Sequence, residues 1–299
     1  MRVPAKIRMV EVGPRDGLQN ETKALSPMDR VAVINRLQAS GLEMIEAGSF
    51  VSQKWVPQMS ETDRVLASLK LDEGVRYPVL VPNMKGFAAA LAAGAKDIAV
   101  FAAASETFSL RNINCSIEDS FQRFYEVCDA AKTNGISVRG YVSCVLGCPY
   151  EGNIDPVAVA EVSKKLIDAG CYEVSLGDTV GVGTPAKAQA MIRAVTTLVP
   201  VEKLAAHFHD TYGQALANLL SVMELGVATI DSSVAGLGGC PYAQGAAGNV
   251  ASEDVLYMLK GMNIETGVDM SGLVEAGRFV CDLLGKKPVS KVSLAWMEA

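Results

Sequence analysis

Positive charge, long apolar runs and histidine are all scarce in this chain of 299 residues. The 27 lysines and arginines are outnumbered by 33 acidic residues, the net charge is −6 and no basic run occurs, so we expect no nucleic-acid partner. The apolar stretches have the length of a strand and are interrupted by charges, so none would span a membrane and we expect no membrane partner.

The cysteines and the N-terminal residues carry information about the cellular compartment. The seven cysteines are an odd number scattered along a large chain, which argues against a disulfide framework and indicates a reducing compartment. An apolar strand follows the first six residues at once, without a signal-type apolar region or a leader rich in arginine and serine. The content of 49% hydrophobic and 20% charged residues is that of a globular protein with a large core.

Short apolar segments alternate with amphipathic ones along the whole chain, which predicts an α/β fold. The expected strands are Ile7–Val12, Glu43–Ala47, Tyr77–Val81, Asp97–Ala102, Ser137–Val145, Glu173–Leu176, Leu204–His209 and Thr229–Val234. The expected helices include Val31–Leu37, Phe121–Ala131, Val159–Ala169 and Ala215–Leu225. Three helix starts carry a capping residue followed by proline, at Ser26-Pro27, Asp155-Pro156 and Thr184-Pro185.

Eight strands, each followed by a helix and with no linker between them, predict one (β/α)₈ TIM barrel as a single catalytic domain over residues 1–299. A doubly wound open sheet is the alternative, but the number of strands and the positions of the polar residues favour the barrel. Beyond Gly261 we expect a C-terminal helical appendage, residues 261–299, with a helix at about Leu273–Leu284 and a polar tail.

The only two histidines are His207 and His209, two positions apart in an apolar run. On a strand, residues i and i+2 point to the same face, so both imidazoles face one point while Phe208 faces the other side. This is the geometry of a chelating pair, and imidazole is a common metal ligand. The alternative is two histidines packed in a core and hydrogen-bonded to neighbours. The pairing and the aspartate that follows favour metal binding.

Polar residues gather where the predicted strands end, and in a barrel these ends form one rim. Asp16 follows the first strand, and its alternative role is a surface ion pair with Arg15. Asn249 ends a glycine-rich loop that follows the last strand. A carboxylate, two imidazoles and an amide oxygen suit Mg²⁺ or Mn²⁺, and would tolerate Co²⁺ or Zn²⁺. Glu46 ends the second strand, either behind the site or as a structural partner of a barrel arginine.

The loop from Gly236 to Asn249 is long, rich in glycine and contains one thiol, Cys240. A plain flexible connection is the alternative, but long loops in compact domains are usually functional. An unperturbed thiol has a pKa of about 8.5, so at neutral pH it is mostly protonated and is suited to donate a proton.

Six motifs of the chain closely resemble 3-hydroxy-3-methylglutaryl-CoA lyases, members of the DRE-TIM metallolyase superfamily. The motifs are the segments Val12–Glu21, Ser49–Ser52, Trp55–Met59, Ser175–Thr179, His207–Asn218 and Gly236–Asn249. The Arg-Asp and His-x-His elements are shared with related synthases and aldolases, whereas the Gly-Gly-Cys-Pro-Tyr loop separates the lyases from them. The resemblance extends roughly from Ile7 to Gly285.

This resemblance implies cleavage of 3-hydroxy-3-methylglutaryl-CoA to acetyl-CoA and acetoacetate, a reaction of leucine degradation and ketone-body formation. It implies a divalent cation held by Asp16, His207, His209 and Asn249. The implied catalytic residues are Arg15, Asp16, Cys240 and Glu46. Residues implied to bind or surround the substrate are Arg15, Ser49, Asn112, Arg139, Tyr141, Ser175, Asp178 and Thr179.

Alternatives within the resemblance are a lyase for longer 3-hydroxy-3-carboxymethyl acyl-CoA substrates and a Claisen-type synthase or aldolase. A non-catalytic protein that binds a metal or an acyl-CoA belongs to a different class, and the presence of the full set of catalytic residue types argues against it. The absence of a mitochondrial leader and of a peroxisome-like C-terminal tripeptide leads us to expect a cytoplasmic enzyme of bacterial type. We expect a homodimer.

Overall fold

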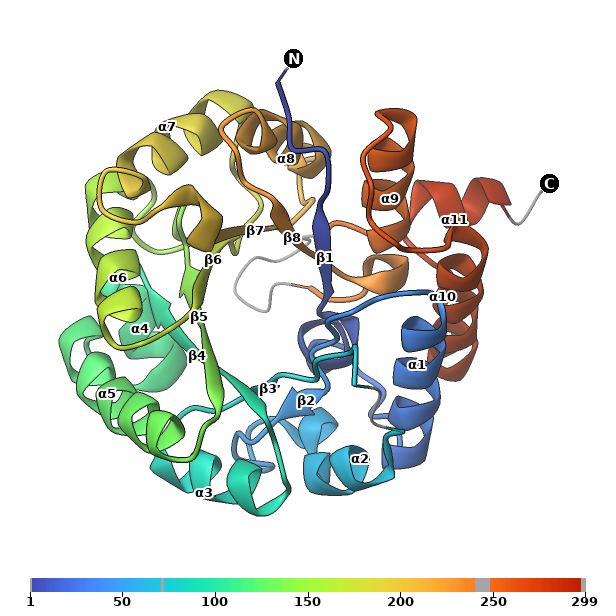
Figure 1. Cartoon of the computed structure of the whole chain (residues 1–299), viewed down its shortest axis with the longest axis horizontal. Helices are drawn as coiled ribbons and strands as arrows, with labels where there is room; N and C mark the ends of the chain where they lie inside the picture. Colours follow the sequence, from blue (N-terminus) through green and yellow to red (C-terminus); the bar gives the residue numbers. More distant parts are fainter. Residues whose placement is uncertain (1, 71–72, 240–247, 297–299) are drawn as a thin grey trace.

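Eight parallel strands form one sheet in the computed structural model, which describes residues 2–70, 73–239 and 248–296. Neighbouring strands follow the order β1-β8-β7-β6-β5-β4-β3-β2. The strands are β1 (Arg8–Glu11), β2 (Gly48–Ser49), β3 (Val79–Leu80), β4 (Asp97–Ala103), β5 (Ser137–Ser143), β6 (Glu173–Asp178), β7 (Leu204–Phe208) and β8 (Thr229–Ser232). A parallel bridge between Glu11 and Ile45 links the two ends of the sheet (Figure 1). The predicted TIM barrel is therefore confirmed.

Helices surround the strands on the outside of the ring (Figure 1). They are α1 (Pro27–Ala39), α2 (Thr62–Ser68), α3 (Met84–Ala92), α4 (Glu106–Ile113), α5 (Ile117–Thr133), α6 (Pro156–Asp168), α7 (Pro185–Val195), α8 (Ala215–Met223), α9 (Ser252–Gly261), α10 (Met270–Leu284) and α11 (Lys291–Trp296). None of the helices in the described ranges combines the length and hydrophobicity needed to cross a bilayer.

Local sequence explains where the helices begin. The side chain of Ser26 accepts a hydrogen bond from the Asp29 N–H at the start of α1, and Asp155 accepts one from Val157 at the start of α6. Thr184 has the extended conformation of a cap, but its side chain makes no capping bond to α7. Two of the three predicted caps therefore work through their side chains, and the third helix begins at its proline.

The second strand differs from the prediction. The segment expected as Glu43–Ala47 makes only isolated bridges through Met44 and Ile45, and β2 lies just after it. The Ala47 N–H donates to the carbonyl of Pro78, but proline has no N–H with which to continue the ladder. The backbone is extended as expected, and a proline in the neighbouring strand interrupts the regular pairing.

The C-terminal helices lie on the barrel's outer layer. Helix α10 packs against α1, and α11 packs against α9 and α10. The expected helix near Leu273–Leu284 is confirmed as α10, whereas the tail expected to be merely polar contains α11. The carboxylate of Asp254 on α9 holds this last segment, because it accepts bonds from the Ser290 hydroxyl and the Val292 N–H.

A buried carboxylate connects the turns that follow the first and the last strand of the barrel. Glu11, at the end of β1, accepts the N–H groups of Gly13 and Val234 at 2.7 and 2.8 Å, and Ser252 donates to it at 2.6 Å. Burial raises the pKa of Glu11 to about 7 against these three hydrogen bonds. Gly13 opens the turn η1 (Gly13–Gly17), and Val234 opens the turn η4 (Val234–Gly236). One side chain thus holds together the turns that follow the first and the last strand.

A second carboxylate, Glu253 of α9, supports the same region. It accepts the N–H of Ala235 at 2.9 Å, and the hydroxyl of Ser293 donates to it at 3.1 Å. Ala235 has a φ of 58°, in the left-handed region that is unusual for a residue other than glycine. Gly277 of α10 leaves room for this carboxylate, because a Cβ there would lie 2.5 Å from Glu253 Oε1. The C-terminal helices therefore brace the strained turn η4.

The substitution Glu253→Gln should change how stability depends on pH. Burial, together with the nearby Glu11, raises the pKa of Glu253 from its ordinary value of 4.5 to about 8. A raised folded-state pKa gives a stabilising contribution that is complete below about pH 4.5 and is lost as the pH rises towards about 8. The free energy of unfolding of wild type relative to Glu253→Gln should therefore fall between pH 5 and pH 8, measured by urea denaturation.

The exposed carboxylate of Glu275 on α10 provides the control, since Glu275→Gln also removes one negative charge. A stability difference between wild type and Glu253→Gln that stays constant from pH 5 to pH 8 would contradict the raised pKa.

Candidate active site

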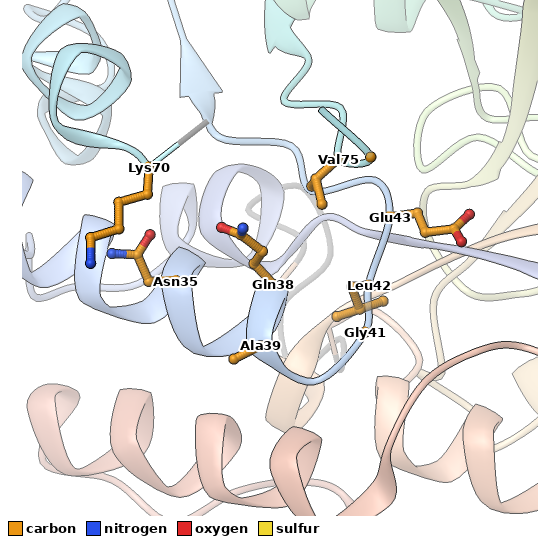
Figure 2. Close-up of a pocket in the computed structure, with 9 residues that line it drawn as sticks. Asn35, Gln38, Ala39, Gly41, Leu42, Glu43, Lys70 and Val75 are labelled. Atoms are coloured by element: carbon orange, nitrogen blue, oxygen red, sulfur yellow. The ribbon is translucent and has the colours of Figure 1, made fainter. Parts of the chain in front are cut away.

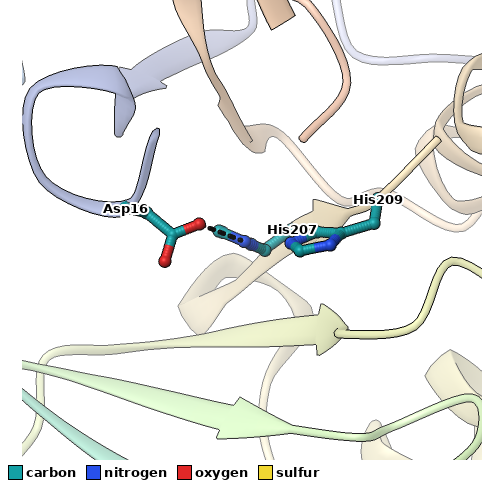
Figure 3. Close-up of side chains that lie close together, drawn as sticks. All are labelled: Asp16, His207 and His209. Atoms are coloured by element: carbon teal, nitrogen blue, oxygen red, sulfur yellow. Dashed lines mark ion pairs between the residues drawn. The ribbon is translucent and has the colours of Figure 1, made fainter. Parts of the chain in front are cut away.

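Three residues that could bind a metal converge at the rim of the barrel. Asp16 lies in η1, His207 on β7, and His209 directly after β7. One ligand atom from each residue lies within 4.8 Å of the others, and Figure 3 shows the carboxylate facing the two imidazoles. The distance from Asp16 Oδ2 to His207 Nε2 is 3.8 Å, and Phe208 is fully buried on the other face of the strand. The predicted alternation is therefore confirmed.

The donor set fits a divalent cation. Nδ1 of His209 is buried and has no hydrogen-bond partner among the described residues, which is costly unless a ligand satisfies it. Burial and the neighbouring His207 lower the pKa of His209 to about 4. Burial acts to raise the pKa of Asp16, but Arg15 and the two imidazoles outweigh it and lower the pKa to about 2. Both side chains are therefore deprotonated at neutral pH, as metal ligands must be.

Asn249 lies beside this group. Its Nδ2 donates to Asp16 Oδ2 at 2.8 Å, and a backbone bridge joins it to His209. These two contacts keep the buried Asn249 next to the candidate metal position. Ligation through its side-chain oxygen stays a prediction. Cys240, the predicted proton donor, lies outside the described residues.

Arg15 and Glu46 form a buried ion pair next to the metal position. Nε of Arg15 donates to Glu46 Oε2 at 2.7 Å, and its Nη1 donates to Asp16 Oδ1 at 2.6 Å. The guanidinium also lies 5.5 Å from the centre of the Tyr141 ring. Glu46 Oε1 is buried without a partner among the described residues, and burial raises the pKa of Glu46 in spite of Arg15. Glu46 therefore pairs with Arg15, and its part in catalysis stays a prediction.

A cavity of about 860 Å³ includes these residues in its lining. Arg15, Asp16, His207 and His209 give it a polar lining, and its apolar wall includes Leu80, Phe101 and Phe124. Asn112 and the charged side chains of Arg111 and Arg123 line it too. The volume is within the usual range for a small-molecule site.

A second cavity, of about 540 Å³, lies at the other end of the barrel (Figure 2). It is lined by the end of α1, by Gly41 and Glu43 in the segment that leads to β2, and by Lys70 and Val75 in the segment that leads to β3. In TIM barrels the active site lies at the carboxyl ends of the strands, so this second cavity has the wrong location for one.

Comparison with known proteins identifies the family. A family model described as HMGL-like matches residues 6–280. The chain belongs to the HMGL-like family. It is 58% identical over 295 residues to a Pseudomonas aeruginosa protein named 3-hydroxy-3-isohexenylglutaryl-CoA/hydroxy-methylglutaryl-CoA lyase, covering 99% of this chain and 98% of that protein. It is also 58% identical to the mitochondrial hydroxymethylglutaryl-CoA lyase of Homo sapiens over 293 residues, 98% of this chain and 90% of that protein.

Solved structures of HMGL-like proteins share the fold closely. The hydroxymethylglutaryl-CoA lyase of Pseudomonas aeruginosa superposes with a TM-score of 0.98 at 58% identity, covering 100% of this chain and 99% of that one. A lyase from Acinetobacter baumannii, solved in complex with coenzyme A and 3-methylmalate, has a TM-score of 0.93 at 33% identity over 97% and 95% of the two chains.

The remaining predicted residues of this HMGL-like chain fall into two groups. Asn112, Tyr141 and Thr179 line the cavity. Ser49, Arg139, Ser175 and Asp178 are buried behind its surface. Ser49 accepts the Val51 N–H, and Asp178 accepts those of Val182 and Gly183 in the loop after β6. Direct contact of these residues with the substrate stays a prediction.

Sequence reasoning missed Asp231. Both its oxygens accept bonds from Arg139, at 2.9 and 2.7 Å, and Oδ2 also accepts one from Ser175 at 2.7 Å. Burial acts to raise the pKa of Asp231, but Arg139 outweighs it and holds that pKa well below its usual range. The only signal in the sequence was an acidic residue inside an apolar strand, which indicates a buried partner but does not name one.

The substitution Asp16→Asn should weaken binding of Mn²⁺ by at least about 100-fold, because it removes the one anionic ligand of the cluster. Isothermal titration of the metal-free protein measures this directly. Asp210→Asn is the matched control, because the neighbouring Asp210 caps α8 by accepting the Ala215 N–H at 2.9 Å. Equal affinities of Asp16→Asn and Asp210→Asn for Mn²⁺ would exclude Asp16 as a ligand.

Proposed function

We propose that this chain is a hydroxymethylglutaryl-CoA lyase that cleaves 3-hydroxy-3-methylglutaryl-CoA to acetyl-CoA and acetoacetate with the help of a divalent cation. The observation that carries the proposal is the full-length similarity, at 58% identity, to proteins of that name, together with the cluster of Asp16, His207 and His209. A related lyase that was solved with coenzyme A supports an acyl-CoA substrate for the cavity.

The reaction breaks the bond between the carbinol carbon and the methylene carbon next to the thioester. The hydroxyl proton passes to a base, and the carbinol carbon becomes the ketone of acetoacetate. The electron pair of the broken bond becomes the enolate of acetyl-CoA, which then takes up a proton on carbon. A bound cation would lower the pKa of the hydroxyl and fix the orientation of the substrate.

The chain's own residues suit the other parts of this reaction. The carboxylate of Asp16, directly or through a water molecule, accepts the hydroxyl proton. Arg15 is permanently cationic and stabilises the enolate oxygen, and Glu46 holds the guanidinium through Nε. Cys240 donates the final proton to carbon. The metal ligands of the proposal are Asp16, His207, His209 and Asn249, with Mg²⁺ or Mn²⁺ as the expected ion.

The purified chain, supplied with Mg²⁺ and 3-hydroxy-3-methylglutaryl-CoA, should produce acetoacetate and acetyl-CoA in equal amounts, and a chelator should abolish the reaction. Cys240→Ser should lower kcat by about 10²–10³-fold, the typical effect of losing one essential group. Cys281→Ala, at a buried cysteine of α10, is the matched control and should keep most of the activity. Absence of acetoacetate with the wild-type protein would overturn the proposed function.

A second candidate substrate class is the longer 3-hydroxy-3-carboxymethyl acyl-CoA thioesters, which carry a larger apolar substituent than methyl at carbon 3. The Pseudomonas aeruginosa relative is named for such a substrate as well as for the methyl one. The cavity offers an apolar wall, because Leu80 and Phe101 pack with Tyr141, whose ring lies 6.0 Å from that of His207. An apolar substituent of a substrate held at the metal position could therefore extend along this wall.

A panel of substrates with increasing chain length at carbon 3 tests this. If the wall accepts the chain, Leu80→Phe should lower kcat/KM for the longest substrate about 10-fold more than for the methyl substrate. Leu110→Phe, at an exposed leucine of α4, is the control. Parallel losses for all chain lengths would exclude the wall as the binding surface, without affecting the lyase proposal.

Assembly as a homodimer and location in the cytoplasm stay predictions from the sequence. The finer choice among Mg²⁺, Mn²⁺, Co²⁺ and Zn²⁺ is part of this proposal and is tested by reconstituting the metal-free protein with each ion.

A further inference from the structure

Asp231 stands directly behind one of the two histidines. Its strand β8 runs parallel to β7, and the register places His207 and Asp231 side by side. Oδ2 of Asp231 lies 3.2 Å from Nδ1 of His207, which is hydrogen-bond distance. The other ring nitrogen of His207, Nε2, is the one that faces Asp16. The two nitrogens of one imidazole therefore have different surroundings.

Two residues, Arg139 and Ser175, fix the position of Asp231. Arg139 holds both carboxylate oxygens through two parallel bonds, a geometry that gives strong orientation as well as charge compensation. The hydroxyl of Ser175 donates to the same oxygen that meets His207. A second carboxylate, Glu173, accepts from Nε of Arg139 at 2.8 Å and contributes to compensating its charge. The side chain of Asp231 is fully buried, so water does not compete for these bonds.

We propose that Asp231 is a positioning residue that holds His207 in the tautomer with hydrogen on Nδ1, and so presents the lone pair of Nε2 to the metal. An ionised carboxylate can only accept hydrogen bonds, so the imidazole nitrogen that meets it must be the donor. A neutral imidazole with hydrogen on Nδ1 has its lone pair on Nε2. This inference rests on the proposed metal site, and assigns Arg139 and Ser175 the task of holding Asp231.

His209 provides a contrast within the same site. Its Nδ1 has no partner among the described residues, so no protein group there selects its tautomer. The alternative role for Asp231 is only to compensate the buried charge of Arg139. Glu173 has that role too, but in the described structure it accepts hydrogen bonds from Arg8, Arg139 and Thr229 and none from a histidine. The two carboxylates therefore separate positioning from charge compensation.

The first test uses the metal-free wild-type protein labelled with [¹⁵N]histidine. Because the sequence has only two histidines, two imidazoles contribute to the spectrum, and the variant His209→Gln identifies the signals of His207. The nitrogen shifts and proton couplings should show hydrogen on Nδ1 of His207. Hydrogen on Nε2 with none on Nδ1 in the wild-type protein would overturn the proposal, whatever the outcome of any activity assay.

The second test compares Asp231→Asn with Glu173→Gln, two substitutions that each remove one charge next to Arg139. Asp231→Asn should give a mixture of His207 tautomers and weaken Mn²⁺ binding about 10–100-fold in isothermal titration. Glu173→Gln should keep both the tautomer and the affinity close to wild type. Equal loss of affinity in both variants, or no loss in Asp231→Asn, would leave charge compensation as the only role of Asp231.

The failures of the two proposals are distinguishable. A wild-type protein that binds no Mn²⁺ overturns the proposed metal site, whereas the tautomer measurement needs no metal. If Asp231→Asn does not unfold cooperatively, the wild-type tautomer alone decides the inference.

Discussion

The pairing of β1 with β8 is the contact on which the candidate site depends. It joins segments more than two hundred residues apart, with Arg8 opposite Thr229 and Glu11 opposite Ser232. Without this pairing, the turn that carries Asp16 would have no fixed relation to the strand that carries His207. Glu11 strengthens the pairing, because its carboxylate accepts the N–H groups of both Gly13 and Val234. The site therefore depends on the same contacts that hold β1 against β8.

Buried charge is the second constraint on the site. Each of its two buried arginines is compensated by carboxylates in direct contact with it and not by solvent. Arg15 is matched by Glu46 and Asp16, and Arg139 by Asp231 and Glu173. Burying an ion pair gives little net stability, but removing one partner from a buried pair is costly. Such pairs therefore keep each other in place. In this site that fixes the arginine beside the metal position before any substrate arrives, which is the preorganisation that electrostatic catalysis needs.

The sequence predicted the parts of this structure that rest on local patterns. Strand and helix positions followed from apolar periodicity, and the common face of His207 and His209 followed from their spacing of two. It did not predict Asp231, Glu11 or Glu253, because one acidic residue in an apolar segment has no local signature. The partners of these residues lie on other elements and become known only through the barrel register. The interrupted second strand was missed for a similar reason, since Pro78 acts across the sheet on a neighbouring segment.

Among the described residues, two buried polar atoms without partners and two residues with positive φ angles lie at the rim that carries the candidate site. Nδ1 of His209 and Oε1 of Glu46 are buried without partners in the described structure, and Ala235 and Cys144 adopt positive φ angles. Each of these features lowers stability, and the folded state keeps them only because the surrounding barrel is well packed. Unsatisfied atoms at a site become favourable contacts when a ligand supplies the missing partner. The Nδ1 of His209, partnerless in the described part of the chain and beside the carboxylate of Asp16, is therefore a physical reason to place ligand binding at this rim.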